Sequence, residues 1–487
     1  MNKPIRTMSI ACMALFIALL VNATYLQYLQ ADELNSRNDN KRVRDAEFSR
    51  ERGAILVHDI SVAESVPVDD EFEYQRVYRS PLKYAHLTGY YSYTYGRNAV
   101  ELTQNDILSG SDPRLFVNRV VDLFGNSQPE GGDVSLTIDP KAQSAAYDGL
   151  RDLGDNVEGS VVALDPSTGA ILAMVSSPTY DPNKLSSHKL NAIQEAWERQ
   201  QGDPARPMLN RGIQEVYPPG STFKLVTAAA ALSSGQYNPG STVPGGTRLD
   251  LPQTDTDLVN DSGGDCGGDK ISLTEALAVS CNVSFGYLGM ELGADTLREQ
   301  AEKFGFGERY FEDLNGQVAS RFPEAPDEPQ TALSAIGQFD VASTPLQMAM
   351  VTAGIANGGS VMKPYLVDEV RSPDLDVLDK ASPEAFREAV SSSVASDLTQ
   401  MMIEVVERGT ATTAQIPGMK VAGKTGTAQS SPDRPPYAWF VSFAPADDPQ
   451  VAVAVLVEDA GVARDAISGS GLAAPIAKRV MEAVMSR

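Results

Sequence analysis

The sequence contains few of the residues from which metal sites and histidine-dependent catalytic groups are built. Its 487 residues include three histidines and three cysteines, and no pair of them has the spacing of a zinc site. We therefore expect no metal and no cofactor, and we expect any nucleophilic mechanism to work without histidine. These six residues are His58, His86, His188, Cys12, Cys266 and Cys281.

Positive charge is also scarce. Lysine and arginine together number 40 against 64 acidic residues, which gives a formal net charge of −24. Such a balance argues against nucleic acid and against an anionic membrane surface as partners, and a solvated acidic exterior accounts for it. The hydrophobic content of 42% is that of a globular protein, and the length favours two or more modules.

One long uncharged stretch stands near the N-terminus. Residues 1–7 carry Lys3 and Arg6, and residues 8–29 carry no charge. Positive charge before an apolar segment of spanning length predicts a transmembrane anchor, with residues 1–7 in the cytosol and the rest of the chain outside it. The alternative is a signal peptide cleaved after residues 21–23, but the apolar character continues past that site and favours an uncleaved anchor.

Both interpretations place Cys266 and Cys281 outside the cytosol, where disulfides can form. A Cys266–Cys281 bridge and two reduced, buried thiols remain equally open alternatives at this stage.

Beyond the anchor, we expect a stalk and a small N-terminal module over residues 30–133, ending in a linker at 126–133. A larger second domain is expected over residues 134–487. Its pattern has strands first (residues 159–177), helices in the middle and strands again near the end, which predicts one antiparallel sheet with helices on its faces, an α/β (α+β) fold.

The segment YPPGSTFKLVTAAAAL, residues 217–232, places a turn, a serine and a lysine in front of an apolar run. Ser221 would occupy the first turn of a helix, where free N–H groups stabilise negative charge, and Lys224 would share its face. An ammonium on an apolar surface has a lowered pKa and could act as a base toward the serine. The pattern alone is weak, because a capping serine and a surface lysine also fit it, and Ser186-x-x-Lys189 is a second, surface match without the turn.

Two further patterns follow in the chain. Ser280-Cys281-Asn282 ends a helical stretch, and Lys424-Thr425-Gly426, followed by Thr427, is the only Lys-(Ser/Thr)-Gly of the sequence and lies on a predicted strand. No single pattern is specific, and the weight lies in the order and context of the three patterns together.

The three motifs, together with RGAI at 52–55, LTID at 136–139 and TPLQ at 344–347, give the chain a resemblance over nearly its whole length to the class B penicillin-binding proteins. It is most similar to their small actinobacterial branch. The resemblance implies a serine β-lactamase/transpeptidase-like fold with a small N-terminal dimerisation or pedestal module. The chain departs from the family pattern at residues 337–339, where Gly-Gln-Phe replaces Gly-Gln-Gly, and at Tyr437, where many relatives have histidine.

The resemblance also implies roles for the motif residues. Ser221 would be the acylated nucleophile, Lys224 its base, and Ser280 a proton relay to the leaving amine. The implied substrate-binding residues are Asn282, which bonds a substrate amide, Lys424, which supports the site electrostatically, and Thr425, Gly426 and Thr427, which hold the substrate carboxylate. The backbone N–H groups of Ser221 and Thr427 would form the oxyanion hole.

The function that the resemblance implies is peptidoglycan D,D-transpeptidation in cell-wall synthesis, with inhibition by β-lactams. The module over residues 30–133 is too short for a glycosyltransferase, so a polymerase of the shape, elongation, division and sporulation (SEDS) family is the implied partner. The alternatives are a D,D-carboxypeptidase or β-lactamase, in which water is the acceptor, and a non-enzymatic scaffold or β-lactam sensor. The sequence leaves open whether septal or lateral wall growth is served.

Overall fold

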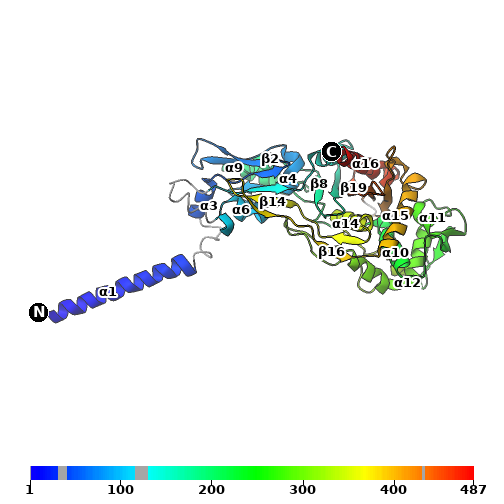
Figure 1. The fold of residues 1–487 in the computed structure, drawn as a ribbon, viewed down its shortest axis with the longest axis horizontal. Coiled ribbons are helices and arrows are strands. Elements are labelled where there is room, and N and C mark those ends of the chain that lie inside the picture. The colour runs from blue at the N-terminus through cyan, green and yellow to red at the C-terminus, as the bar shows by residue number, and fades with distance from the viewer. Residues whose placement is uncertain (1, 31–40, 116–129, 430–433, 487) are drawn as a thin grey trace.

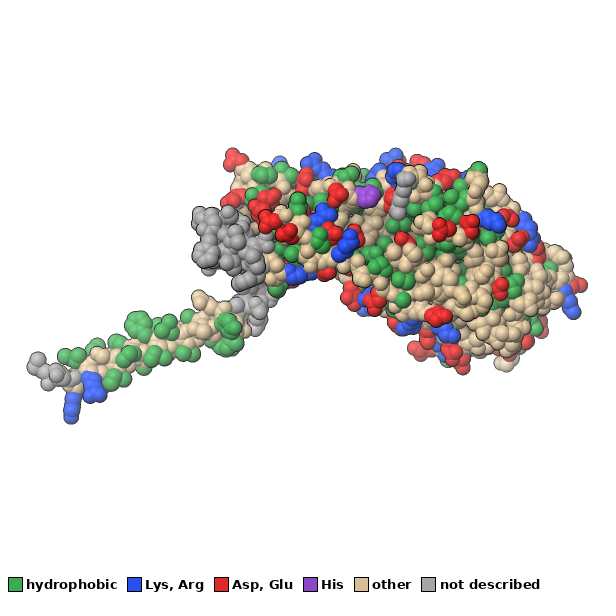
Figure 2. Space-filling model, in the orientation of Figure 1, with side chains coloured by type: hydrophobic (Ala, Val, Ile, Leu, Met, Phe, Trp, Pro, Cys, Tyr) green, Lys and Arg blue, Asp and Glu red, His purple; other side chains and the backbone are tan. Residues whose placement is uncertain are grey.

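The computed structural model describes residues 2–30, 41–115, 130–429 and 434–486 (Figure 1). The first part of the predicted linker, residues 126–129, lies outside these ranges. Helix α1 (Asn2–Thr24) continues into the π-helical turn η1 (Tyr25–Leu29). Within the described residues, Lys3–Leu29 is the one helix long and apolar enough to cross a membrane. Apolar side chains cover it on the face that Figure 2 shows, as a membrane anchor requires.

The N-terminal module contains a six-stranded sheet in the order β15-β14-β6-β1-β2-β3. Its strands are β1 (Ile55–Val57), β2 (Ile60–Pro67), β3 (Tyr74–Tyr78), β6 (Asp133–Leu136), β14 (Val367–Arg371) and β15 (Val377–Lys380). Strand β6 pairs with β1 in parallel and with β14 in antiparallel orientation. The expected boundary at 133/134 therefore falls inside a sheet to which both parts of the chain contribute strands.

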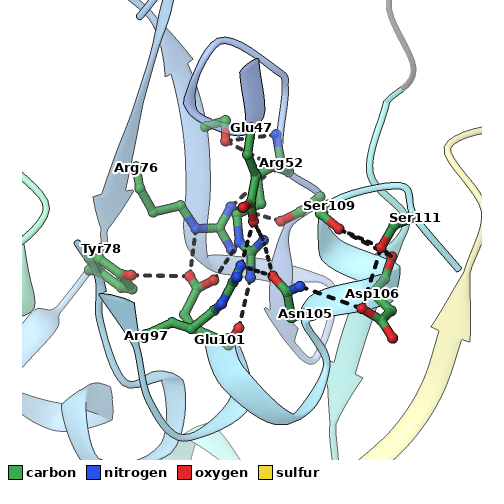
Figure 3. Close-up of polar contacts among 12 residues, drawn as sticks. Glu47, Arg52, Arg76, Tyr78, Arg97, Glu101, Asn105, Asp106, Ser109 and Ser111 are labelled. Atoms are coloured by element: carbon green, nitrogen blue, oxygen red, sulfur yellow. Dashed lines mark hydrogen bonds and ion pairs between the residues drawn. The ribbon is translucent and has the colours of Figure 1, made fainter. Parts of the chain in front are cut away.

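Short elements surround this sheet: α3 (Lys41–Phe48), α4 (Pro81–Thr88), β4 (Tyr91–Ser92), β5 (Gly96–Arg97), α5 (Val100–Thr103) and α6 (Asn105–Leu108). Glu101 of α5 is fully buried between Arg52 and Arg76, and Figure 3 shows both guanidinium groups directed at its carboxylate. Buried charges are tolerated when they are paired in this way.

The catalytic part contains a five-stranded sheet in the order β17-β18-β19-β7-β8, with every neighbouring pair antiparallel. Its strands are β7 (Glu158–Leu164), β8 (Ile171–Ser177), β17 (Ala422–Ala428), β18 (Tyr437–Ala444) and β19 (Val451–Asp459). The early and late strands of this part of the chain thus form one sheet, as predicted. Strand β17, which carries Lys424 and Thr425, lies at its edge.

Every residue of β18 is buried, because helices cover both faces of the sheet. Helices α8 (Pro140–Arg151) and α16 (Ala474–Met485) pack against each other and against the sheet, and α14 (Pro345–Ala356) packs against β7, β18 and β19. Trp439, Phe440 and Phe443 of β18 are fully buried, as expected of core residues.

The remaining helices are α9 (Leu190–Gly202), α10 (Lys224–Ser233), α11 (Leu273–Ala278), α12 (Asn282–Lys303), α13 (Glu328–Ala335) and α15 (Ser392–Glu407). Short strands complete the helical region: β9 (Thr242–Pro244), β10 (Arg248–Asp250), β11 (Asp257–Val259), β12 (Lys270–Ser272), β13 (Ser360–Met362) and β16 (Ala385–Glu388). The predicted α+β class, an antiparallel sheet flanked by helices, is confirmed.

Candidate active site

The segment in front of Ser221 is held by three separate parts of the fold. Tyr217 exchanges two backbone hydrogen bonds with Ser343, at 2.9 and 2.8 Å. The indole N–H of Trp439 donates to the carbonyl of Pro218 at 3.0 Å, and the N–H of Gly220 donates to the carbonyl of Gly337 at 3.0 Å. The two prolines and the glycine thus fix the turn from which Ser221 projects.

Ser221 lies in a 3₁₀ turn, Gly220–Phe223, and the α-helix proper begins at Lys224. The α-helix therefore starts three residues later than the predicted start near Ser221. Two glycines let this turn lie against strand β17. A Cβ at Gly220, whose φ is +53°, would lie 2.9 Å from the Thr427 carbonyl oxygen, and one at Gly426 would lie 2.9 Å from Thr222.

The Lys224 side chain is fully buried, and its ammonium lies among three oxygen atoms. It donates to the Ser280 carbonyl at 2.7 Å, to the Ser280 hydroxyl at 3.2 Å and to Asn282 Oδ1 at 2.7 Å. These bonds join the first two motifs. Catalytic hydrogen bonds often tighten only once substrate is present, so these contacts of Lys224 are compatible with a later bond to the Ser221 hydroxyl.

The second buried lysine, Lys424, also contacts the hydroxyl of Ser280. Its Nζ donates to the Ser280 hydroxyl at 2.9 Å and to the Thr425 carbonyl at 2.9 Å. The Ser280 hydroxyl therefore accepts from both lysines. Ser280 adopts a left-handed backbone, with φ at +61°, between α11 and α12. Such a conformation is sparsely populated by residues other than glycine and is frequent at functional sites.

Burial lowers the pKa of both lysines of the site. Burial lowers the pKa of Lys224 to about 7, against the opposing influence of Asp261. Burial first, and the charge of Lys224 second, hold the pKa of Lys424 well below its usual value, again opposed by Asp261. At neutral pH part of the population therefore has a neutral amine, which can accept a proton.

The middle residue of the second motif is cross-linked. Cys281 forms a disulfide with Cys266, with the Cα atoms 5.8 Å apart. The bond fastens the loop that contains Asp261 to the Ser280–Asn282 motif. The amide of Asn282 donates to the Val259 carbonyl and to Asp261 Oδ1, both at 3.1 Å.

Two cavities meet at Ser221, and both are lined by Thr427 and Asp261. The first, of 540 Å³, is rich in hydroxyl groups. The second, of 400 Å³, has an apolar wall. The hydroxyl residues of the first cavity are Ser221, Ser262, Ser280, Thr410, Thr425, Thr427, Ser468 and Ser470, and the apolar residues of the second are Leu258, Val259, Leu333, Ile336 and Phe339.

The structure thus brings together all the residues that the motifs predicted, from the Gly220–Phe223 turn and the start of α10, the α11–α12 connection and β17. It adds residues that the sequence analysis did not assign to the site. Asp261 contacts Asn282, and the hydroxyl of Thr410 lies 2.6 Å from that of Thr425. The second Ser-x-x-Lys match differs. Lys189 is exposed as expected, but Ser186 is buried, contrary to the prediction, and donates to the Pro182 carbonyl.

Comparison with known families matches this arrangement. Residues 159–482 match the penicillin binding protein transpeptidase domain, and residues 52–134 match the penicillin binding protein A dimerisation domain. The chain belongs to the penicillin-binding protein transpeptidases. The family predicted from the motifs is confirmed.

Individual relatives extend the similarity to full length. The chain is 44% identical to the peptidoglycan D,D-transpeptidase PbpA of Mycolicibacterium smegmatis over 497 aligned residues, covering 100% of this chain and 99% of the relative. It resembles the ceftriaxone acyl-enzyme complex of penicillin-binding protein A from M. tuberculosis with a TM-score of 0.87 and 43% identity, covering 91% of this chain and 100% of that one. The penicillin G acyl-enzyme complex of the same protein gives a TM-score of 0.85 at 43% identity, with 90% and 100% coverage.

Proposed function

We propose that this chain is a peptidoglycan D,D-transpeptidase that works through an acyl-enzyme on Ser221. The observation that carries the proposal is the Ser280 hydroxyl, which lies within hydrogen-bond distance of both buried lysines beside the serine turn. This arrangement provides a nucleophile, a base of lowered pKa and a path for the proton. Family membership and full-length similarity to named D,D-transpeptidases support the same reaction.

In the acylation step, the neutral amine of Lys224 takes the proton of the Ser221 hydroxyl as the oxygen attacks the carbonyl of the penultimate D-alanine. The backbone N–H groups of Ser221 and Thr427 stabilise the resulting oxyanion. The proton then passes by way of Ser280 to the departing amine of the terminal D-alanine, and an ester on Ser221 remains. Thr427 of β17 lies opposite Ala438 of β18, and among the described residues no strand pairs with the other side of β17, where an extended peptide can add.

The terminal carboxylate of the substrate binds in the hydroxyl-rich cavity. Thr425 and Thr427 line it, and Gly426 between them carries no side chain to obstruct it. A carboxylate bound beside Lys424 favours the protonated form of that lysine, which then supplies positive charge, and Asn282 holds a substrate amide. In the second step the amine of a neighbouring strand attacks the ester and releases Ser221. A β-lactam undergoes the same first step, and its acyl group stays on the serine.

The N-terminal helix anchors the chain in the cell membrane. We propose that residues 1–7 are cytosolic and that the domain from residue 134 onward lies outside the membrane, where peptidoglycan stem peptides are found. The charge distribution about the apolar segment supports this orientation. A SEDS-family polymerase is the proposed partner, because the module over residues 30–133 has no room for a glycosyltransferase.

The test is intact-mass measurement of the full chain in detergent after exposure to penicillin G, beside the Ser221→Ala variant. The expected result is an adduct of the drug's mass on the wild type alone that persists for hours. Rapid loss of the adduct with drug turnover would make the chain a β-lactamase. Absence of any adduct would leave the scaffold as the better account.

A further inference from the structure

The two cavities at Ser221 differ in chemistry, and a substrate has to use them differently. Asp261, Asp265 and Glu275 also line the hydroxyl-rich cavity, so a carboxylate finds its partners there at the hydroxyl groups of Thr425 and Thr427, next to Lys424. The substrate's leaving group ends in that carboxylate. The part of the substrate on the other side of the scissile bond, the acyl donor, must then extend away from Ser221 in another direction. The second cavity, with its apolar wall, offers that route.

Phe339 stands on the apolar wall of the second cavity. It is 49% exposed, which is unusual for a phenylalanine, and its backbone φ is +61°. A bulky residue in the left-handed region costs roughly 1 kcal/mol or more and persists only where its surroundings hold it. Asparagine or glycine would occupy this position without that cost. A strained, exposed ring beside a nucleophile points to contact with something that is bound there.

The backbone that leads to Phe339 is anchored beside Ser221. Gly337, two residues earlier, accepts the hydrogen bond from the Gly220 N–H. A Cβ at Gly337 would lie 2.1 Å from the Gly220 carbonyl oxygen, so the two backbones are in direct contact. The loop that carries Phe339 is therefore attached to the turn that carries the nucleophile.

We propose that Phe339 is a specificity-determining residue whose ring packs against the acyl-donor chain attached through Ser221. This inference rests on the proposed function and names the part of the substrate that the second cavity selects. The favoured donors present an apolar face next to the reacting carbonyl, such as the methyl groups of a stem peptide or the benzyl group of penicillin G. Leu258, Val259 and Ile336 complete the apolar wall.

The chain offers a matched control for this residue. Leu375, in the turn between β14 and β15, also has a left-handed backbone, with φ at +67°, and is 65% exposed. It does not line either of the two cavities at Ser221. Changing Phe339 or Leu375 to glycine removes an exposed apolar side chain and relieves the same backbone strain. The two variants differ in their position relative to Ser221.

The experiment measures the second-order rate constant of acylation of the full chain by two β-lactams. Penicillin G carries a benzyl side chain, and 6-aminopenicillanic acid carries none. Phe339→Gly and Phe339→Asn should each slow acylation by penicillin G roughly tenfold, as expected for loss of one apolar contact in the transition state, with less than a twofold effect on 6-aminopenicillanic acid. Leu375→Gly should leave both rates unchanged, and Phe339→Tyr should keep the wild-type preference.

An equal loss with both drugs, or no loss with either, would overturn the assignment, since the ring would then have a structural role or none. The melting temperatures of Phe339→Gly and Leu375→Gly should not fall, because glycine accepts a positive φ. A wild type that neither drug acylates would instead refute the proposed function itself.

Discussion

In the part of the chain that the structure describes, two buried basic side chains meet at one acceptor in two places, and the two clusters are built differently. In the N-terminal module, Arg52 and Arg76 donate to the two carboxylate oxygens of Glu101 at 2.6 and 2.7 Å (Figure 3). In the catalytic domain, Lys224 and Lys424 share the neutral hydroxyl of Ser280. Each cluster holds two cations out of water, but a buried carboxylate lies between the cations only in the first.

The buried carboxylate of Glu101 favours the charged form of the basic side chains around it. Burial alone would raise the pKa of Glu101, but the charges of Arg76 and Arg52 and their hydrogen bonds outweigh it and lower that pKa. The cluster stays ionised and serves as a scaffold. In the active site the nearest carboxylate, Asp261, is solvent-exposed, and burial lowers the pKa of both lysines. Lysine without a buried counter-ion thereby becomes a usable base.

The largest expected effect comes from removing the buried base. Lys224→Met keeps the length of the side chain and takes away its amine, so acylation of Ser221 should slow about 10³-fold. Stability should change little, because a costly buried charge is lost together with its hydrogen bonds. Rates of adduct formation by mass spectrometry test this. Lys189→Met, in the second Ser-x-x-Lys match, is the control and should react as wild type. A Lys224→Met rate within tenfold of wild type would contradict the assignment of the base.

Breaking the other cluster should affect folding and leave the chemistry unchanged. Glu101→Gln removes the charge shared by Arg52 and Arg76, and should cost about 3 kcal/mol of unfolding free energy because two buried cations lose their counter-ion. The exposed pair Arg79–Glu64 gives the control, since Glu64→Gln should cost less than about 1 kcal/mol. Denaturant titration measures both. Equal losses in the two variants would mean that the buried cluster is not a scaffold.

Much of the site could be predicted from the sequence because its chemistry lies in contiguous motifs. Ser221 with Lys224, Ser280 with Asn282, and Lys424 with Thr425 each lie within four residues of one another, and the apolar strands β18 and β19 are readable as unbroken runs. Local sequence therefore specifies each part, and the order of the three motifs identifies the site.

The remaining features depend on contacts between distant segments. Strand β14 pairs with β6 across more than two hundred residues, so no local pattern places it in the N-terminal sheet. Asp261 and Thr410 enter the site through loops whose sequences carry no motif. The start of α10 was misplaced because a 3₁₀ turn and an α-helix share the same residue preferences over one turn.

The two clusters should also differ in the pH range over which each one affects the protein. Because Lys224 acts as a base with a pKa of about 7, acylation should fall roughly tenfold for each pH unit below 7 and level off above it. The apparent pKa of acylation will reflect the titration of Lys224 and Lys424 together, because the two amines interact. The lowered pKa of Glu101 means that its contribution to stability is present above about pH 4.3, its unfolded value, and is lost only at lower pH. Acylation rates between about pH 5 and 8.5 test the first statement, and a rate that is flat across this range would contradict it. The difference in unfolding free energy between wild type and Glu101→Gln, measured from about pH 3 to pH 7, tests the second.

The smallest effect should come from the exposed carboxylate beside the lysines. Asp261→Asn keeps an acceptor for the Asn282 amide and removes the charge that opposes the lowering of both lysine pKa values. The apparent pKa of acylation should move down, which raises the rate at pH 6 about twofold, a small shift because solvent and salt screen an exposed charge. Asp255→Asn removes a carboxylate from the turn between β10 and β11, outside both cavities, and should change nothing. If Asp261→Asn instead raised the apparent pKa of acylation, the charge of Asp261 would not be what raises the pKa of the two lysines. A shift that disappears at high salt would identify the effect as electrostatic, because salt screens the charge of an exposed Asp261.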